Sequence, residues 1–225
     1  MRTITIVLLF FFGQLLCAQN ESVRKYAISV DMNRPIAFGN NFFNKAYDDQ
    51  IGFGINLQRN FKYFFVEFNY QNSSVSISKP ELIGNFQSSD GECFDFIAGF
   101  RQFLSNTSYF MEYKIGMGTR KIYNYSTIGN YNNSATNFLI GTRVNKKIGK
   151  HFIVFGNIDL NYSSFVTNNL GPYDSFYGNA YQFIPSVGLK LPFGRFLNDK
   201  KLKYVKKHAG KFDSKPNYKN IEIMQ

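Results

Sequence analysis

Residues 181–193 read Tyr-Gln-Phe-Ile-Pro-Ser-Val-Gly-Leu-Lys-Leu-Pro-Phe, and this stretch decides the fold class. Apolar residues, most of them large, occupy every second position from Tyr181 to Phe193. Most of the positions between them are small or polar, as at Ser186 and Gly188. Successive side chains of a β-strand point to opposite faces of the sheet, so this period of two predicts a strand with one apolar and one mostly polar face.

Seven earlier stretches repeat the alternation: residues 24–33, 50–58, 61–71, 92–103, 108–121, 136–146 and 151–163. The connections after the second, fourth and sixth stretches are short. The others are long and rich in Asn, Ser, Gly and Asp, as loops are; they are residues 35–49, 72–91, 122–135 and 164–179. Short turns at one rim and long loops at the other are typical of transmembrane β-barrels, whose short turns are periplasmic. An even number of strands then places both termini in the periplasm.

The period alone does not say which face points outward, because a soluble eight-stranded cup has its apolar face inside. The volume of the side chains favours the opposite arrangement. The interior of an eight-stranded barrel is only just wide enough for its own side chains. The apolar face is crowded with Phe, Tyr, Met and Leu, whereas the other face holds Gly, Asn, Ser and charges of both signs. We therefore predict an all-β, eight-stranded antiparallel up-and-down transmembrane β-barrel with the aromatic rings facing lipid.

Charged residues on the inner face should neutralise one another, because buried charges need partners. We predict a charge network in the barrel lumen made of Glu67, Asp95, Arg101, Glu112, Lys114, Arg120, Arg143 and Asp159.

The two ends of the chain differ from the barrel in composition. Arg2 followed by an apolar run predicts a signal peptide over residues 1–18, with the barrel at 19–196 and a basic periplasmic tail at 197–225. Residues 195–225 hold nine Lys or Arg against three acidic residues, so the net charge of +11 is mainly a property of the tail and does not predict nucleic-acid binding. The tail either contacts anionic headgroups or an acidic partner, or is a solvated disordered segment. Cleavage after Ala18 leaves Cys93 as the one cysteine, which excludes an intramolecular disulfide.

The last strand also carries a short motif. Ser186, Gly188, Leu191 and Phe193 stand at the spacing polar-x-Gly-x-x-apolar-x-aromatic. This resembles the closing-strand signal by which bacterial outer-membrane barrels are recognised for assembly. With the signal peptide and the alternating strands, it makes residues 20–196 similar to the small outer-membrane β-barrel domain of the Bacteroidota, which includes PorT-like proteins, and more distantly to OmpX and the OmpA barrel. The resemblance implies a Gram-negative outer membrane, contact with lipid and lipopolysaccharide, and the barrel assembly machinery as a partner.

No constellation of residues predicts catalysis, a cofactor or a metal. The chain has two His residues, His151 at a short turn and His208 in the tail, and no Ser/His/acid set. Eight strands do not enclose an open channel. We therefore predict a structural or binding role through long extracellular loops, with a protein partner at the loops or the tail. An accessory role in a PorT-like secretion machine is the alternative, and a lipid A-modifying enzyme is less favoured.

Overall fold

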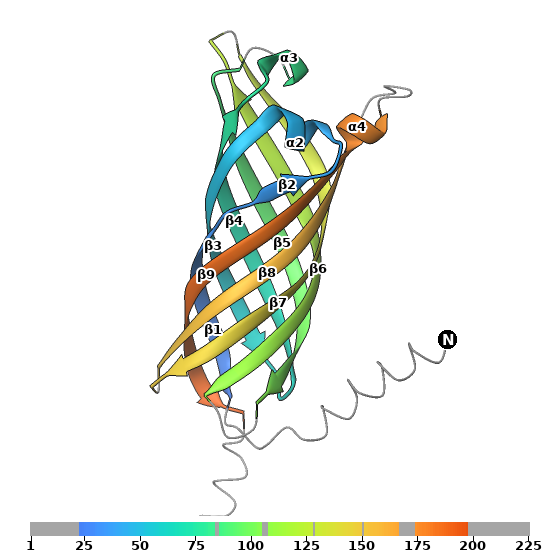
Figure 1. Ribbon diagram of the computed structural model, residues 1–225. Helices are drawn as coiled ribbons and strands as arrows, with labels where there is room; N and C mark the ends of the chain where they lie inside the picture. The colour runs from blue at the N-terminus through green and yellow to red at the C-terminus, as the bar shows by residue number, and fades with distance from the viewer. Residues whose placement is uncertain are drawn as a thin grey trace, which may run out of the picture.

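The computed structural model describes residues 23–83, 86–104, 108–127, 129–149, 151–166 and 174–197. Its chain forms an antiparallel sheet in which sequential long strands are neighbours, and β1 pairs with β9 to close a barrel (Figure 1). The long strands are β1 (Arg24–Asn33), β3 (Tyr47–Asn60), β4 (Phe64–Ile77), β5 (Ser88–Phe103), β6 (Tyr109–Tyr125), β7 (Asn130–Ile148), β8 (Phe152–Phe165) and β9 (Asn179–Phe196). The predicted antiparallel up-and-down barrel is confirmed.

The barrel has two distinct ends. The turn end holds the short connections β3–β4, β5–β6 and β7–β8, together with the start of β1 and the end of β9, which pair through Arg24 and Phe196. The loop end holds the other connections and three short helices, α2 (Phe42–Ala46), α3 (Pro80–Ile83) and α4 (Asp174–Gly178) (Figure 1). No helix in the described ranges has the length and apolar character needed to cross a membrane.

Two predictions about the strands are wrong. A ninth, short strand, β2 (Ile36–Phe38), pairs with the loop-end part of β9. The strands also extend into the expected long loops, most of all at residues 122–135: β6 and β7 pair as far as Tyr125 and Asn130, so that only residues 126–129 connect them.

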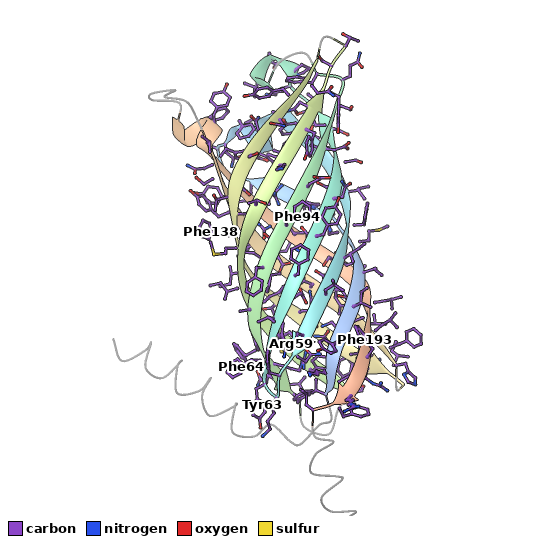
Figure 2. The ribbon with its side chains drawn as sticks, turned by 180° about the vertical axis from the view of Figure 1, so that it is seen from behind. Arg59, Tyr63, Phe64, Phe94, Phe138 and Phe193 are labelled. Atoms are coloured by element: carbon purple, nitrogen blue, oxygen red, sulfur yellow. The ribbon has the colours of Figure 1, made fainter. Side chains whose placement is uncertain are left out.

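The outer wall of the barrel carries a belt of apolar side chains. Phe64, Phe68 and Phe96 are exposed, whereas Arg101 and Glu112 are 3% and 0% exposed, so the predicted assignment of the two faces is confirmed. Phe68, Phe96, Met117 and Phe138 are consecutive register partners across β4, β5, β6 and β7. Figure 2 shows the labelled Phe64, Phe94, Phe138 and Phe193 on the outside of the sheet.

Towards the loop end, the outward side chains of the same strands become polar and their inward side chains become apolar. On β4 the outward residues change from Phe68 and Tyr70 to Asn72, Ser74 and Ser76. On β5, Glu92, Asp90 and Ser88 continue outward beyond Phe94. On β7, Thr136, Ser134 and Asn132 continue beyond Phe138. The partners Tyr70, Phe94 and Thr119 lie side by side at this change, so the boundary crosses neighbouring strands at one level.

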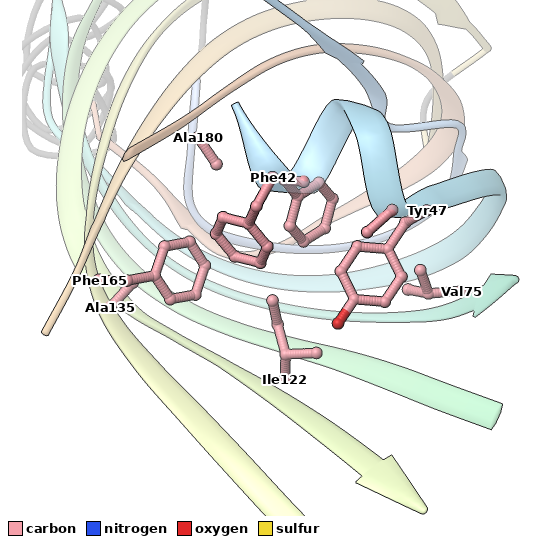
Figure 3. Packing of buried hydrophobic residues seen from close by; sticks show 9 residues of the cluster. Phe42, Tyr47, Val75, Ile122, Ala135, Phe165 and Ala180 are labelled. Atoms are coloured by element: carbon pink, nitrogen blue, oxygen red, sulfur yellow. The ribbon is translucent and has the colours of Figure 1, made fainter. Parts of the chain in front are cut away.

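Inside the same segments the side chains become apolar. Val75, Ile122, Ala135, Phe165 and Ala180 point inward and pack against Phe42, Phe43 and Ala46 of α2 and against Tyr47 (Figure 3). The sheet therefore has a polar interior and apolar exterior along the belt, and an apolar interior and polar exterior at the loop end. The polar outward residues are why these segments resemble loops in the sequence.

Candidate functional site

The centre of the barrel holds one connected group of charges. Glu112 of β6 accepts hydrogen bonds from Arg101 and Lys190, each at 2.6 Å. Arg143 donates to both carboxylate oxygens of Glu67, at 2.7 and 2.8 Å, and also reaches Glu112 at 3.4 Å. These five side chains come from β4, β5, β6, β7 and β9, so the network links strands around most of the barrel.

The other four residues proposed for the lumen network form smaller groups. Lys114 pairs with Asp159 at 2.9 Å, and Asn157 also donates to Asp159. Asp95 accepts hydrogen bonds from Asn137 and Asn69. Arg120 is buried on β6 opposite Cys93 of β5. All eight residues are buried, but they are divided between separate clusters.

Sequence reasoning missed Lys190, which completes the central group. Its position carried a signal, because it shares the inner face of β9 with Ser186 and Gly188. Asp31 was also missed; its carboxylate accepts a hydrogen bond from Asn56 of the neighbouring strand at 2.9 Å.

At the level of the belt, three aromatic rings also lie inside the barrel, although stacked rings were expected to be tight there. Phe65, Phe110 and Phe155 are each at most 3% exposed. Phe65 lies against Gly99 and Phe155 lies against Gly188, in both cases a register partner on the neighbouring strand. The missing glycine side chain provides the space for the ring. Two cations of the lumen lie over these rings. The Cζ of Arg143 is 4.8 Å from the centre of the Phe155 ring, and the Cζ of Arg101 is 5.2 Å from the centre of the Phe110 ring.

The four residues of the proposed assembly signal lie on both faces of β9. Ser186 faces the lumen and accepts a hydrogen bond from Asn157 at 3.1 Å. Gly188 also faces inward, against Phe155. Leu191 and Phe193 face outward, where the Phe193 ring stacks on Tyr26 of β1 with 5.7 Å between ring centres. Two of the positions thus determine inner packing, and the other two belong to the apolar belt.

The loop end is closed by the apolar cluster around α2. The Phe42 ring packs edge-on against Phe165, with 5.3 Å between ring centres, and Phe43 lies 4.9 Å from Tyr47. Asn41 caps the helix by accepting a hydrogen bond from the backbone N–H of Asn44 at 2.9 Å. The cap holds the two rings in the barrel mouth, where they fill the space between the strands (Figure 3).

Of the two His residues considered for catalysis, the structure describes only His151. His151 lies at the turn end, and His208 lies outside the described residues, as do the signal peptide and nearly all of the basic tail. Among the described residues, no group of three His, Cys, Asp or Glu side chains is arranged to hold a metal ion.

Comparison with known proteins gives the fold a context. No family model matches the chain, and no curated protein sequence matches it. Among solved structures, Neisserial surface protein A is similar with a TM-score of 0.57 and 11% identity, covering 77% of this chain and 100% of that one. The attachment invasion locus protein Ail of Yersinia pestis has a TM-score of 0.50 and 12% identity, covering 76% of this chain and 99% of its own. The chain therefore has the fold of the small outer-membrane β-barrels.

Proposed function

We propose that this protein is an integral outer-membrane β-barrel that presents its loop end at the cell surface as a binding surface and conducts no solutes. One observation carries the proposal: the two faces of the sheet exchange character at the level of Tyr70 and Phe94. An apolar outer wall is suited to hydrocarbon, and a polar outer wall around an apolar interior is suited to water.

The dimensions of the belt agree with a bilayer. On β8, outward apolar side chains run from Phe152 to Tyr162, which is within the roughly 9–11 residues that a tilted strand needs to cross the hydrocarbon. Tyr70 and Tyr162 lie at the loop-end boundary of the belt and Tyr109 at the turn-end boundary, as interfacial aromatic residues do in such barrels.

Two layers support the absence of a pore. The buried ion pairs of Glu67, Glu112 and Arg143 occupy the middle of the lumen, and Phe42 and Phe43 occupy its loop end. A solute would have to separate the charges of a buried ion pair and also displace the rings of α2.

The loop end is a folded structure with its own apolar core, and this supports a binding role. Its strands extend beyond the belt and display Asn, Ser and Thr side chains, with Tyr131 59% exposed and Val166 84% exposed. Binding residues are commonly carried on connections held by a rigid scaffold. The turn end, in contrast, has only short connections.

Site-directed labelling tests the orientation. In a Cys93→Ser background, Lys79→Cys at the loop end and Lys62→Cys at the turn end place a thiol at exposed positions. A membrane-impermeant maleimide applied to intact cells should label position 79, and should label position 62 only after the outer membrane is permeabilised. Labelling of position 62 alone on intact cells would reverse the orientation.

Photo-crosslinking tests the binding role. A photo-reactive phenylalanine analogue at position 131 should give adducts with an external macromolecule, and the same analogue at position 59, outward at the turn end, should not. Loss of secreted cargo on gene deletion, with no adduct from position 131, would favour the secretion role instead.

A further inference from the structure

A cavity of about 500 Å³ opens at the turn end of the barrel, opposite the loop end. Its inner end is formed by Arg101 and Lys190 of the lumen network, and its sides include the inward-facing Phe103, Phe110 and Ile153. Cavities of roughly 300–1,000 Å³ hold small organic ligands in proteins. The cavity lies at the opposite end from the proposed binding surface, so it suggests a separate property.

The wall of the cavity is mostly apolar. The rings of Phe103 and Phe110 pack together with 5.6 Å between their centres, and Ala27 of β1 faces them from the other side of the pocket lining. The fully buried Phe110 is in contact with the guanidinium of Arg101. An apolar wall thus leads directly to a buried cation.

The charge of the lining has a single sign. Arg24, Arg101, Lys147 and Lys190 line the cavity, and no Asp or Glu is among its described lining residues. The central network behind it contains three cations, Arg101, Arg143 and Lys190, against the carboxylates of Glu67 and Glu112. A small anion entering the cavity therefore meets a lining whose charged side chains are all cationic.

Arg101 supplies a specific donor for such an anion. Its Nε and Nη2 donate to Glu112, and Nη2 also donates to Asn60 at 2.8 Å. Its Nη1, in contrast, is buried and has no hydrogen-bond partner in the part of the chain that the structure describes. An unsatisfied donor on a buried charged group is costly, and a guanidinium edge fits a carboxylate or phosphate.

We propose that this cavity binds a single-chain anionic amphiphile, with its carboxylate or phosphate head at Arg101 and its hydrocarbon chain along Phe103 and Phe110. The chain's own tail is a poor occupant, because residues 195–225 hold nine Lys or Arg against three acidic residues. The charge and the apolar wall together select an amphiphile over a simple inorganic ion.

Calorimetric titration of the full mature protein in phosphatidylcholine nanodiscs tests the proposal, with empty nanodiscs as the blank. The probes are octanoate, octyl phosphate and octylamine, all below their micelle concentrations. Saturable binding of octanoate or octyl phosphate, and none of octylamine, is expected; comparing the first two distinguishes a fatty acid from a phosphate-headed lipid as the source of the ligand.

Three variants locate the site. Ala27→Leu fills the cavity without changing a charge, and Arg101→Gln removes the donor that has no partner. Each variant should weaken binding about tenfold or more. The first blocks the space for the hydrocarbon chain, and the second removes one charge-assisted hydrogen bond. Lys146→Gln is the matched control, because Lys146 is an exposed cation at the same end that does not line the cavity. Heat-modifiability on a denaturing gel verifies that each variant is folded.

Several results would overturn the proposal. They are the absence of saturable binding of either anion, equal affinity for octylamine, and unchanged binding by the folded Ala27→Leu variant. Binding that appears only after removal of residues 198–225 would also overturn it, because the tail would then be the natural occupant.

Discussion

The ring of Phe155 lies inside the barrel against Gly188, its register partner on β9, at a distance that leaves no room for a side chain at position 188. A Cβ at Gly188 would lie 2.5 Å from the ring and would also meet the backbone oxygen of Val30 on β1. Gly188 thus allows three strands to approach where the barrel closes. This gives the glycine of the proposed assembly motif a packing role in addition to any role in recognition.

Gly188→Leu should impair closure of the barrel. The added side chain would collide with Phe155 and with the β1 backbone, and overpacking of this kind costs about 1–3 kcal/mol or more. Urea unfolding in lipid vesicles and heat-modifiability measure the effect. Gly156→Leu is the control, because a Cβ at that outward position meets no atom within 4 Å. Equal stability of the two variants would contradict the packing role.

Arg143→Met should strongly destabilise the folded barrel. It leaves the buried carboxylate of Glu67 without its bidentate partner, and breaking a buried pair costs about 3–5 kcal/mol. The double variant Glu67→Leu/Arg143→Met removes both charges, so its free energy of unfolding should recover towards that of the wild type. A double variant less stable than Arg143→Met would show that the pair contributes more than mutual neutralisation.

Phe96→Arg should oppose insertion into the bilayer, because position 96 faces outward within the apolar belt, one outward position inside the boundary at Phe94. An arginine facing lipid costs about 2–4 kcal/mol at the midplane and less towards the interface. Ser74→Arg is the matched control: it is outward on the neighbouring strand β4 but beyond the boundary, where water is expected. Folding yield into vesicles separates the two. If Ser74→Arg fails as badly, the boundary lies further towards the loop end.

Phe42→Ala combined with Phe43→Ala should loosen the loop end while the belt still assembles. Each ring is almost fully buried, and truncating a buried Phe costs about 3–5 kcal/mol. Limited proteolysis of the folded barrel should then cut near α2, with the heat-modifiable band retained. Lys45→Ala, which changes an exposed side chain of the same helix, should leave the cleavage pattern unchanged. Loss of the folded band in the double variant would show that the loop-end core is needed for assembly.

The sequence by itself determined the barrel, its eight long strands, its short turns and the direction of each face. Those conclusions depend on side-chain parity and volume, which are local properties, as the outward Phe96 and the buried Glu112 show. The same alternation places Lys190 on the inner face, although the predicted charge network did not include it.

Only the tertiary structure decided where the strands end and how the interior fills. Asn72, Ser74 and Ser76 face outward beyond the loop-end boundary of the apolar belt, and they are polar there. The sequence does not show where along a strand this boundary lies. The pairing of Phe155 with Gly188, and of Glu67 with Arg143, joins residues whose distance depends on register around a closed sheet. Closure of the barrel brings together side chains from strands that are distant in the sequence. The alternation along one strand does not say which residue of another strand each side chain contacts.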